Sequence, residues 1–428
     1  MITIFQIFAV LLILLFLGVP VAFSIGISSL AAIYFFGINV PLSMLPANMF
    51  SGLNSFTLMA VPFFVMAGEV MNKAGVTSRM IAFADAWVGH LRGGLSHVNV
   101  LCAMIMAGVS GSGTADAAAL GTALIPAMEE KGYDRDYAVA LTAAANTVGP
   151  IIPPSTLFIL YGFYTGTSVS ALFMGGLLPG IIIGLSVATL SYFICRKHGY
   201  GQDTRPFNIK NSLKQTVVNG PAVLVPAFLV IAITTGLCTA TEAGVFIVFF
   251  SIILGICYGT LRSFSDFYDV IVRSVMSTAS IFAMLATSGI FSNILARAKF
   301  QTIIVEVLHG LIDTPRLLLL AVFAFILVLG CFVDVAPMII MFSAAFCAVA
   351  VQAGISPLTF GVIFVISGML GSITPPVGCL LFITTQVSGL PMTRTVKRIW
   401  PFMILYTASV MLLIVFPGIC TFVPSLIG

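Results

Sequence analysis

The chain has 428 residues, of which 60% are hydrophobic and only 7% are charged, and its mean hydropathy is +1.16. Soluble domains carry about 25% charged residues, so this composition excludes an ordinary soluble protein and predicts an all-α polytopic membrane protein. The net charge of +4 is scattered over the ends of apolar segments, which argues against a nucleic-acid partner.

Other broad classes are excluded by what the sequence lacks. The eight cysteines lie mostly inside apolar runs and form no CxxC pair, so neither a disulfide framework nor a transition-metal site is expected. The chain carries no Walker A motif, so no ATPase of its own is expected. No basic region precedes the first apolar run and no cleavage site follows it, so the N-terminus is predicted to be a retained membrane helix.

The first half of the chain is predicted to hold scaffold, transport and closing segments. Residues 1–93 form scaffold spans and an amphipathic interfacial arm, with helices expected at 3–17, 20–37, 57–72 and 75–93. Residues 94–169 hold a re-entrant helical hairpin with a polar, Gly-rich centre, followed by a broken helix. Residues 170–216 hold a closing span and a hydrophilic cytoplasmic loop.

The second half is predicted to repeat this order. Residues 217–316 hold scaffold spans at 217–236, 241–260 and 276–295 and then a segment of mixed polarity. Residues 317–388 hold a second hairpin and a second broken helix, and residues 389–428 hold the last span. Pro375 follows Pro153 by 222 residues, and the same offset pairs Gly371 with Gly149 and Asp334 with Ser112. The sequence therefore predicts two structural repeats.

Both broken helices carry a proline pair inside an apolar segment. The first reads Gly-Pro-Ile-Ile-Pro-Pro-Ser at 149–155, and the second reads Gly-Ser-Ile-Thr-Pro-Pro-Val at 371–377. Adjacent prolines remove two amide donors and clash with the preceding turn, so neither helix can continue. Unpaired backbone in hydrocarbon must be buried in protein or line a cavity, and a matched pair of breaks is typical of a transporter's central site.

The basic residues predict the orientation of the chain. If the loop at 196–216 is cytoplasmic, most lysines and arginines lie inside, and only Arg297, Lys299 and Arg316 lie outside. The first hairpin then opens inward and the second outward. The two repeats are therefore predicted to have inverted topology.

The candidate sodium ligands come from the hairpin centres and the breaks. Unwound carbonyls and half-helix C-termini suit a dehydrated sodium ion, and the opposing N-termini suit a carboxylate. The predicted sodium ligands are Ser110, Ser112, Asp116, Asn146, Gly149, Ile152, Asp334, Gly371 and Thr374. An acid at membrane depth is functional by default, so Asp116 and Asp334 are expected to act in transport. The alternative is that each acid caps a buried turn.

The candidate substrate contacts overlap with this set. They are Ser110, Gly111, Ser112, Pro154, Ser155 and Arg297. Arg297 lies at the end of a span, where it either meets an anionic substrate or extends to lipid headgroups.

One enzymatic alternative arises from residues 108–111, which read Gly-Val-Ser-Gly and match the GxSG of rhomboid-type intramembrane proteases. Such a protease needs a histidine base on another core helix. The four histidines lie in loops, in surface helices or near span ends, at His90, His97, His198 and His309. An enzyme is therefore not expected.

The hairpin motif at 108–116 and the two proline motifs, in this order over the whole chain, resemble the large membrane subunit of tripartite ATP-independent periplasmic (TRAP) transporters. The resemblance implies a bacterial inner-membrane secondary transporter with an elevator mechanism and Na+ as coupling ion, without a cofactor. It implies an organic-acid substrate, such as sialic acid or a C4-dicarboxylate, delivered by a periplasmic solute-binding protein.

The same resemblance implies a small four-helix membrane subunit as partner. This subunit is expected to be a separate chain, because the sequence begins with the large subunit's first span. Two alternatives remain. One is a stand-alone sodium- or proton-coupled carboxylate carrier or antiporter without a binding protein, and the other is a channel with re-entrant pore helices.

Overall fold

The computed structural model describes residues 2–202 and 206–427, without the side chains of Val109, Ser110, Thr234, Gln301, His309 and Ile427. Within these ranges every regular element is a helix, which confirms the all-α prediction. Six of the described helices are long and apolar enough to cross a membrane. A seventh span results when the helices at residues 44–53 and 57–73, which are bent by 64° relative to each other, are counted as one.

The first quarter of the chain contains α1 (Ile2–Phe16), α2 (Val21–Tyr34), α3 (Met44–Leu53), the 3-10 turn η1 (Thr57–Met59), α4 (Ala60–Lys73) and α5 (Val76–Val88). The sequence did not predict α3, whose ten residues include a proline and two polar side chains and which is held by packing on a later helix. The predicted arm helix is α5. Its Arg79 lies 3.5 Å from the ring centre of Tyr258, and its Trp87 donates a hydrogen bond to Thr216.

The segments predicted to form the first hairpin and the first broken helix are four helices. They comprise α6 (Gly94–Ser110), α7 (Gly113–Glu130), α8 (Arg135–Asn146) and α9 (Thr156–Thr165), and the closing span is α10 (Val169–His198). We call α6 with α7 hairpin 1, and residues 147–155 break 1. Gly111 turns the chain at the tip with φ = 57°, a left-handed conformation that favours glycine.

The second half contains α11 (Ile209–Thr234), α12 (Ala240–Cys257), α13 (Phe264–Arg297), α14 (Phe300–Ile312), α15 (Pro315–Gly330), α16 (Val335–Gln352), α17 (Pro357–Gly371), α18 (Cys379–Ser388), α19 (Met392–Val415) and α20 (Gly418–Ile427). We call α15 with α16 hairpin 2, and residues 372–378 break 2. The predicted span at 276–295 was too short, because a capping box of Ser263 and Asp266 starts α13 twelve residues earlier.

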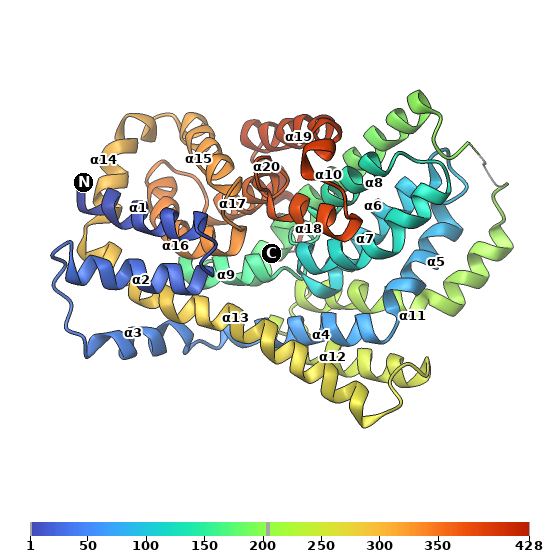
Figure 1. The fold of residues 1–428 in the computed structure, drawn as a ribbon, viewed down its shortest axis with the longest axis horizontal. Helices are drawn as coiled ribbons and strands as arrows, with labels where there is room; N and C mark the ends of the chain where they lie inside the picture. The colour runs from blue at the N-terminus through green and yellow to red at the C-terminus, as the bar shows by residue number, and fades with distance from the viewer. Residues whose placement is uncertain (1, 203–205, 428) are drawn as a thin grey trace.

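The helices pack as two groups, of which the scaffold helices α2, α3, α4, α12 and α13 lie along the lower side of the view in Figure 1. In the scaffold group, α13 packs on α2, α3 and α4, and α12 packs on α4. In the hairpin group, both hairpins and both broken helices pack on one another, and α10 and α19 pack on them too. The site described below lies where the two groups face each other.

Candidate functional site

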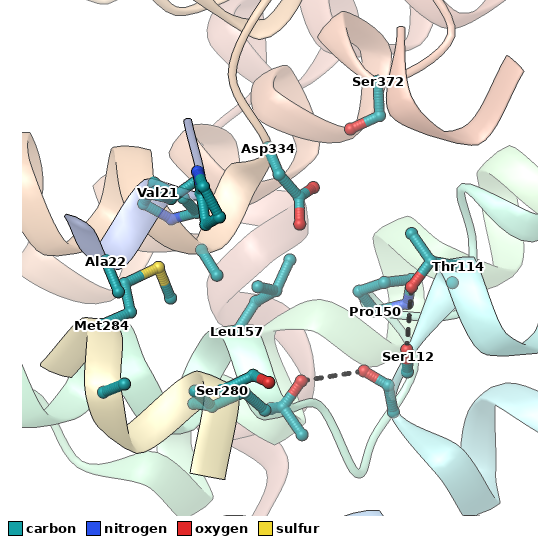
Figure 2. A pocket seen from close by; sticks show the side chains of 18 of the residues that line it. Val21, Ala22, Ser112, Thr114, Pro150, Leu157, Ser280, Met284, Asp334 and Ser372 are labelled. Carbon is teal, nitrogen blue, oxygen red and sulfur yellow. Dashed lines mark hydrogen bonds between the residues drawn. The ribbon is translucent and has the colours of Figure 1, made fainter. Parts of the chain in front are cut away.

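A cavity of about 660 Å³ lies between the two groups of helices. Both hairpin tips and both breaks contribute to its wall, and α2 and α13 close it from the scaffold side (Figure 2). The lining residues that the following paragraphs use are Gly111, Ser112, Thr114, Pro150, Thr156, Leu157, Ser280, Met284, Asp334, Ser372 and Leu380.

Four helices of the hairpin group begin at this cavity. Their first residues are Gly113 of α7, Thr156 of α9, Val335 of α16 and Cys379 of α18, and each helix has a lining residue in its first turn or at its N-cap. The N-terminus of a helix carries a partial positive charge from its unpaired amides. Four helix N-termini therefore direct partial positive charge at the cavity, whose lining residues in the described part of the chain include no lysine, arginine or histidine and one carboxyl group, that of Asp334.

The tip of hairpin 1 is joined to break 1. Thr156 donates a hydrogen bond of 3.0 Å to the carbonyl oxygen of Gly111, and Ser112 and Thr114 share one of 3.2 Å. A Cβ on Gly111 would lie 2.8 Å from the carbonyl oxygen of Pro154, so only glycine allows this approach. The tip and the break therefore form one unit.

Two residues predicted to contact substrate, Pro154 and Ser155, lie outside the wall of this cavity. Ser155 is fully buried, donates a hydrogen bond to the carbonyl oxygen of Pro150 and accepts one from the amide of Phe158, so it caps α9. Ser155 and Pro154 are not among the lining residues, whereas Pro150, on the other side of the break, is.

A second group of predicted ligands meets behind hairpin 1. Asn146 is buried at the C-terminal end of α8. Its amide nitrogen donates a hydrogen bond of 2.8 Å to the carbonyl oxygen of Thr142, and its Oδ1 is buried without a hydrogen-bond partner. Asp116 is fully buried, and its Oδ2 lies 3.6 Å from the position that a Cβ on Gly149 would take. Asn146, Gly149 and Asp116 are therefore brought together at break 1.

Asp116 does not line the cavity, although Thr114 does. Residues two apart on an α-helix point about 200° from each other, so Thr114 and Asp116 lie on opposite faces of α7. Ser112 instead takes the position that the repeat pairs with Asp334, because these two residues are the N-caps of α7 and α16. The carboxylate at the cavity wall is that of Asp334, whose Oδ1 accepts a hydrogen bond of 2.8 Å from the amide of Val335.

Break 2 is packed tightly against hairpin 2. A Cβ on Gly371 would lie 2.6 Å from the Cα of Gly330. The amide of Gly378 donates a hydrogen bond of 3.1 Å to the carbonyl oxygen of Cys331. The carbonyl oxygens of Ser372 and Thr374 both lie 3.0 Å from the position of a Cβ on Gly378. Gly371 and Thr374 are thus next to carbonyl oxygens of the kind that can ligate a cation.

Three predicted site residues remain, namely Arg297, Ile152 and Ser110. Arg297 is exposed at the end of α13, where it donates hydrogen bonds to Asn293 and to the carbonyl oxygen of Asn39. It lies thirteen residues, or about 20 Å along the helix, from Met284 at the cavity. Ile152 packs against Gly180 of α10. The side chain of Ser110 lies outside the described residues.

The sequence analysis missed the scaffold wall of the cavity. Ser280 and Met284 lie on one face of α13, four residues apart, and residues 20–23 of α2 complete this side. A serine inside an apolar span was a weak signal, since its contact with the hairpins depends on how distant segments pack. The protease alternative also finds no support, because His97 and Ser110 lie about 20 Å apart on the same helix.

Comparison with known proteins agrees with this architecture. The family model described as "Tripartite ATP-independent periplasmic transporter, DctM component" matches residues 8–419. The chain is 33% identical over 417 residues to the sialic acid TRAP transporter large permease protein SiaM of Vibrio cholerae, with 96% of each chain covered. It is 31% identical over 406 residues to the C4-dicarboxylate TRAP transporter large permease protein DctM of Pseudomonas aeruginosa, covering 94% of this chain and 92% of that one.

A solved structure shares the fold. The Alcanivorax borkumensis YdaH transporter superposes with a TM-score of 0.60 at 13% sequence identity, over 88% of each chain. The family match implies that a small permease subunit and a periplasmic binding protein are partners. The chain belongs to the DctM-component family of tripartite ATP-independent periplasmic transporters and is a multi-pass inner-membrane permease, not an enzyme.

Proposed function

We propose that this permease couples the entry of sodium to the uptake of an organic acid, which a periplasmic binding protein delivers and a separate small subunit helps to import. The observation that supports this best is the cavity where four helix N-termini meet between the scaffold and hairpin groups. Backbone amides at helix N-termini bind carboxylates without a basic side chain. A cavity of about 660 Å³ lies within the size range of small-molecule sites.

The substrate is proposed to bind with its carboxylate toward Ser112 and Thr114, whose hydroxyls and helix N-terminus lie on one wall. Asp334 lies on another part of the wall and supplies an acceptor for a hydroxyl or amine of the substrate, or a ligand for sodium. Sialic acid and C4-dicarboxylates, which the names of the two relatives give, are the two substrates to test first.

Sodium is proposed to bind at the two breaks. At break 1, Asn146 offers a buried oxygen that lacks a hydrogen-bond partner, beside Asp116 and Gly149. At break 2, the carbonyl oxygens of Ser372 and Thr374 gather around Gly378, next to Gly371. Both groups are rich in oxygen and include C-terminal ends of half-helices, which favour cations.

Movement is proposed to follow an elevator mechanism with the two repeats inverted in the membrane. The substrate cavity has one wall on the hairpin group and one on the scaffold group, so sliding one group along the other carries the site with the hairpins. Because α10 and α19 pack on the hairpins and broken helices, they are proposed to move with them.

Replacing Asn146 by leucine tests the first sodium site. The buried Oδ1 lacks a hydrogen-bond partner, so its removal offsets the loss of the hydrogen bond that the amide nitrogen donates to Thr142. The melting temperature without sodium is therefore expected to change little. The rise in melting temperature that sodium causes should shrink, because ligand binding stabilises the folded state only through the occupied site. Ser251→Ala is the control, since Ser251 also buries an unpartnered oxygen, its Oγ, but lies on α12 of the scaffold group. An unchanged sodium response in Asn146→Leu would remove Asn146 from the site.

Uptake into proteoliposomes tests the whole proposal. The chain is reconstituted with its small subunit, and uptake of labelled sialic acid and succinate is measured with and without an inward sodium gradient and the binding protein. Uptake is expected only when both are present. Uptake at the same rate without the binding protein would favour the stand-alone carrier. Uptake at the same rate without a sodium gradient would contradict the proposed ion sites.

A further inference from the structure

A second, much smaller cavity lies behind hairpin 1, on the side of Asp116 that faces the scaffold. Its volume is about 10 Å³, and its lining residues come from α4 and α5 of the scaffold and from α6 and α7 of the hairpin. The polar lining residues are Asp116, Asn72 and Thr77, and the remaining ones are Gly68, Met71, Val76, Met80 and Met106. The cavity therefore lies at a contact between the two groups of helices.

This cavity has the size and the chemistry of a site for one water molecule. A cavity needs roughly 10–15 Å³ by this measure to hold a water, and the water needs two to four polar partners. Thr77 already donates a hydrogen bond of 2.9 Å to Oδ1 of Asn72, which leaves the amide hydrogens of Asn72 and the lone pairs of Thr77 for another group. A water can accept from Asn72 and donate to both Thr77 and Asp116, which uses its donors and an acceptor.

We propose that a bound water in this cavity connects Asp116 of hairpin 1 to Asn72 and Thr77 of the scaffold, and that this polar contact holds the hairpin in the position described here. The proposal rests on the elevator movement proposed above. It makes Thr77 and Asn72 positioning residues, which act through Asp116 and touch neither the substrate cavity nor the proposed ion sites.

The same carboxylate reaches the first proposed ion site. Oδ2 of Asp116 lies 3.6 Å from the Cβ position of Gly149, while the side chain also lines the small cavity. A sodium ion at break 1 would draw negative charge from Asp116 and weaken its hydrogen bond to the water. Sodium binding would thereby loosen the contact that has to break when hairpin 1 slides along α4 and α5.

The test measures the position of hairpin 1 relative to the scaffold in the full complex. Donor and acceptor fluorophores are placed through non-natural amino acids at Lys131, just after α7, and at Phe264, at the start of α13, both of which are exposed. Thr77→Val keeps the size of the side chain and removes the hydroxyl. Without sodium it is expected to shift the ratio of populations away from the wild-type position by about two- to tenfold, the range for one net hydrogen bond.

Two further variants serve as controls. Thr77→Ser keeps the hydroxyl and should restore the wild-type ratio. Ser78→Ala removes an exposed neighbouring hydroxyl that does not line the cavity and should change nothing. A wild-type ratio in Thr77→Val would overturn the proposal, and so would equal shifts in Thr77→Val and Ser78→Ala.

A thermal double-mutant cycle decides the question even if no movement is seen. Thr77→Val and Asp116→Leu, which leaves no hydrogen-bond acceptor at residue 116, should each lower the melting temperature. The loss in the double variant should be smaller than the sum of the two single losses, because both changes break one water bridge. Additive losses would contradict the bridge. If wild-type fluorescence shows one position with and without sodium, the elevator proposal fails, while the cycle still tests the water-mediated contact.

Discussion

Gly371→Val is expected to abolish uptake and to lower the melting temperature of the permease strongly. The Cα atoms of Gly371 and Gly330 are so close that a single added Cβ would lie 2.6 Å from the backbone of hairpin 2. Two backbones cannot adjust as a flexible side chain can, so α15 and α17 would have to separate. Overpacking of a tight contact typically costs about 1–3 kcal/mol, and the larger valine should reach the upper end of that range.

Gly310→Val is the matched control for this prediction. Gly310 is exposed on α14, and a Cβ built there meets no atom within 4 Å. Melting followed by size-exclusion chromatography in detergent, together with uptake in proteoliposomes, distinguishes the two variants. If Gly371→Val melted and transported like Gly310→Val, the close approach of break 2 to hairpin 2 would not be needed for the fold.

Asp334→Asn is expected to reduce uptake about 10- to 100-fold, which corresponds to the loss of one hydrogen bond or contact to a charged group. Asparagine caps helices as well as aspartate does, so α16 should still begin at Val335 and the variant should fold. The substitution therefore separates the charge of Asp334 from its capping role. Uptake should be measured over a range of substrate and sodium concentrations, to show which of the two ligands loses affinity.

Asp313→Asn removes one acidic charge at the exposed end of α14, away from the cavity, and should leave uptake unchanged. The capping alternative for Asp334 makes a different prediction. If it holds, Asp334→Asn would transport like the wild type, and only Asp334→Ala would lower the melting temperature. The cavity would then bind its ligands without this carboxylate.

The breaks and hairpins could be predicted from the sequence because their causes are local. A proline pair ends a helix wherever it occurs, and the polar, Gly-rich centre at 108–116 cannot cross hydrocarbon as one helix. The capping motif of Thr239 and Glu242 is equally local, and both of its hydrogen bonds form at the start of α12. In each case a few neighbouring residues determine the backbone.

The remaining errors concern how distant segments pack. Which way Asp116 points depends on how α7 is rotated against α4 and α5, and nothing in residues 108–116 specifies that rotation. The short helices α3, α14 and α20 lack the long apolar run of a span and are stabilised by packing on other helices. Arg297, for which the sequence left open a substrate contact or an extension to lipid headgroups, donates hydrogen bonds to Asn293 and to the carbonyl oxygen of Asn39 at the far end of α13.

The four helix N-termini at the cavity have a consequence for selectivity. The dipoles of four helices carry no proton that can dissociate, so their attraction for an anion should persist over every pH at which the protein is folded. Mutations also cannot easily remove this attraction, since it belongs to the backbone. On the proposed function, the side chains of α2 and α13 on the other wall would be the part of the site that sets which acid fits, while the backbone contact with the acid group would stay the same.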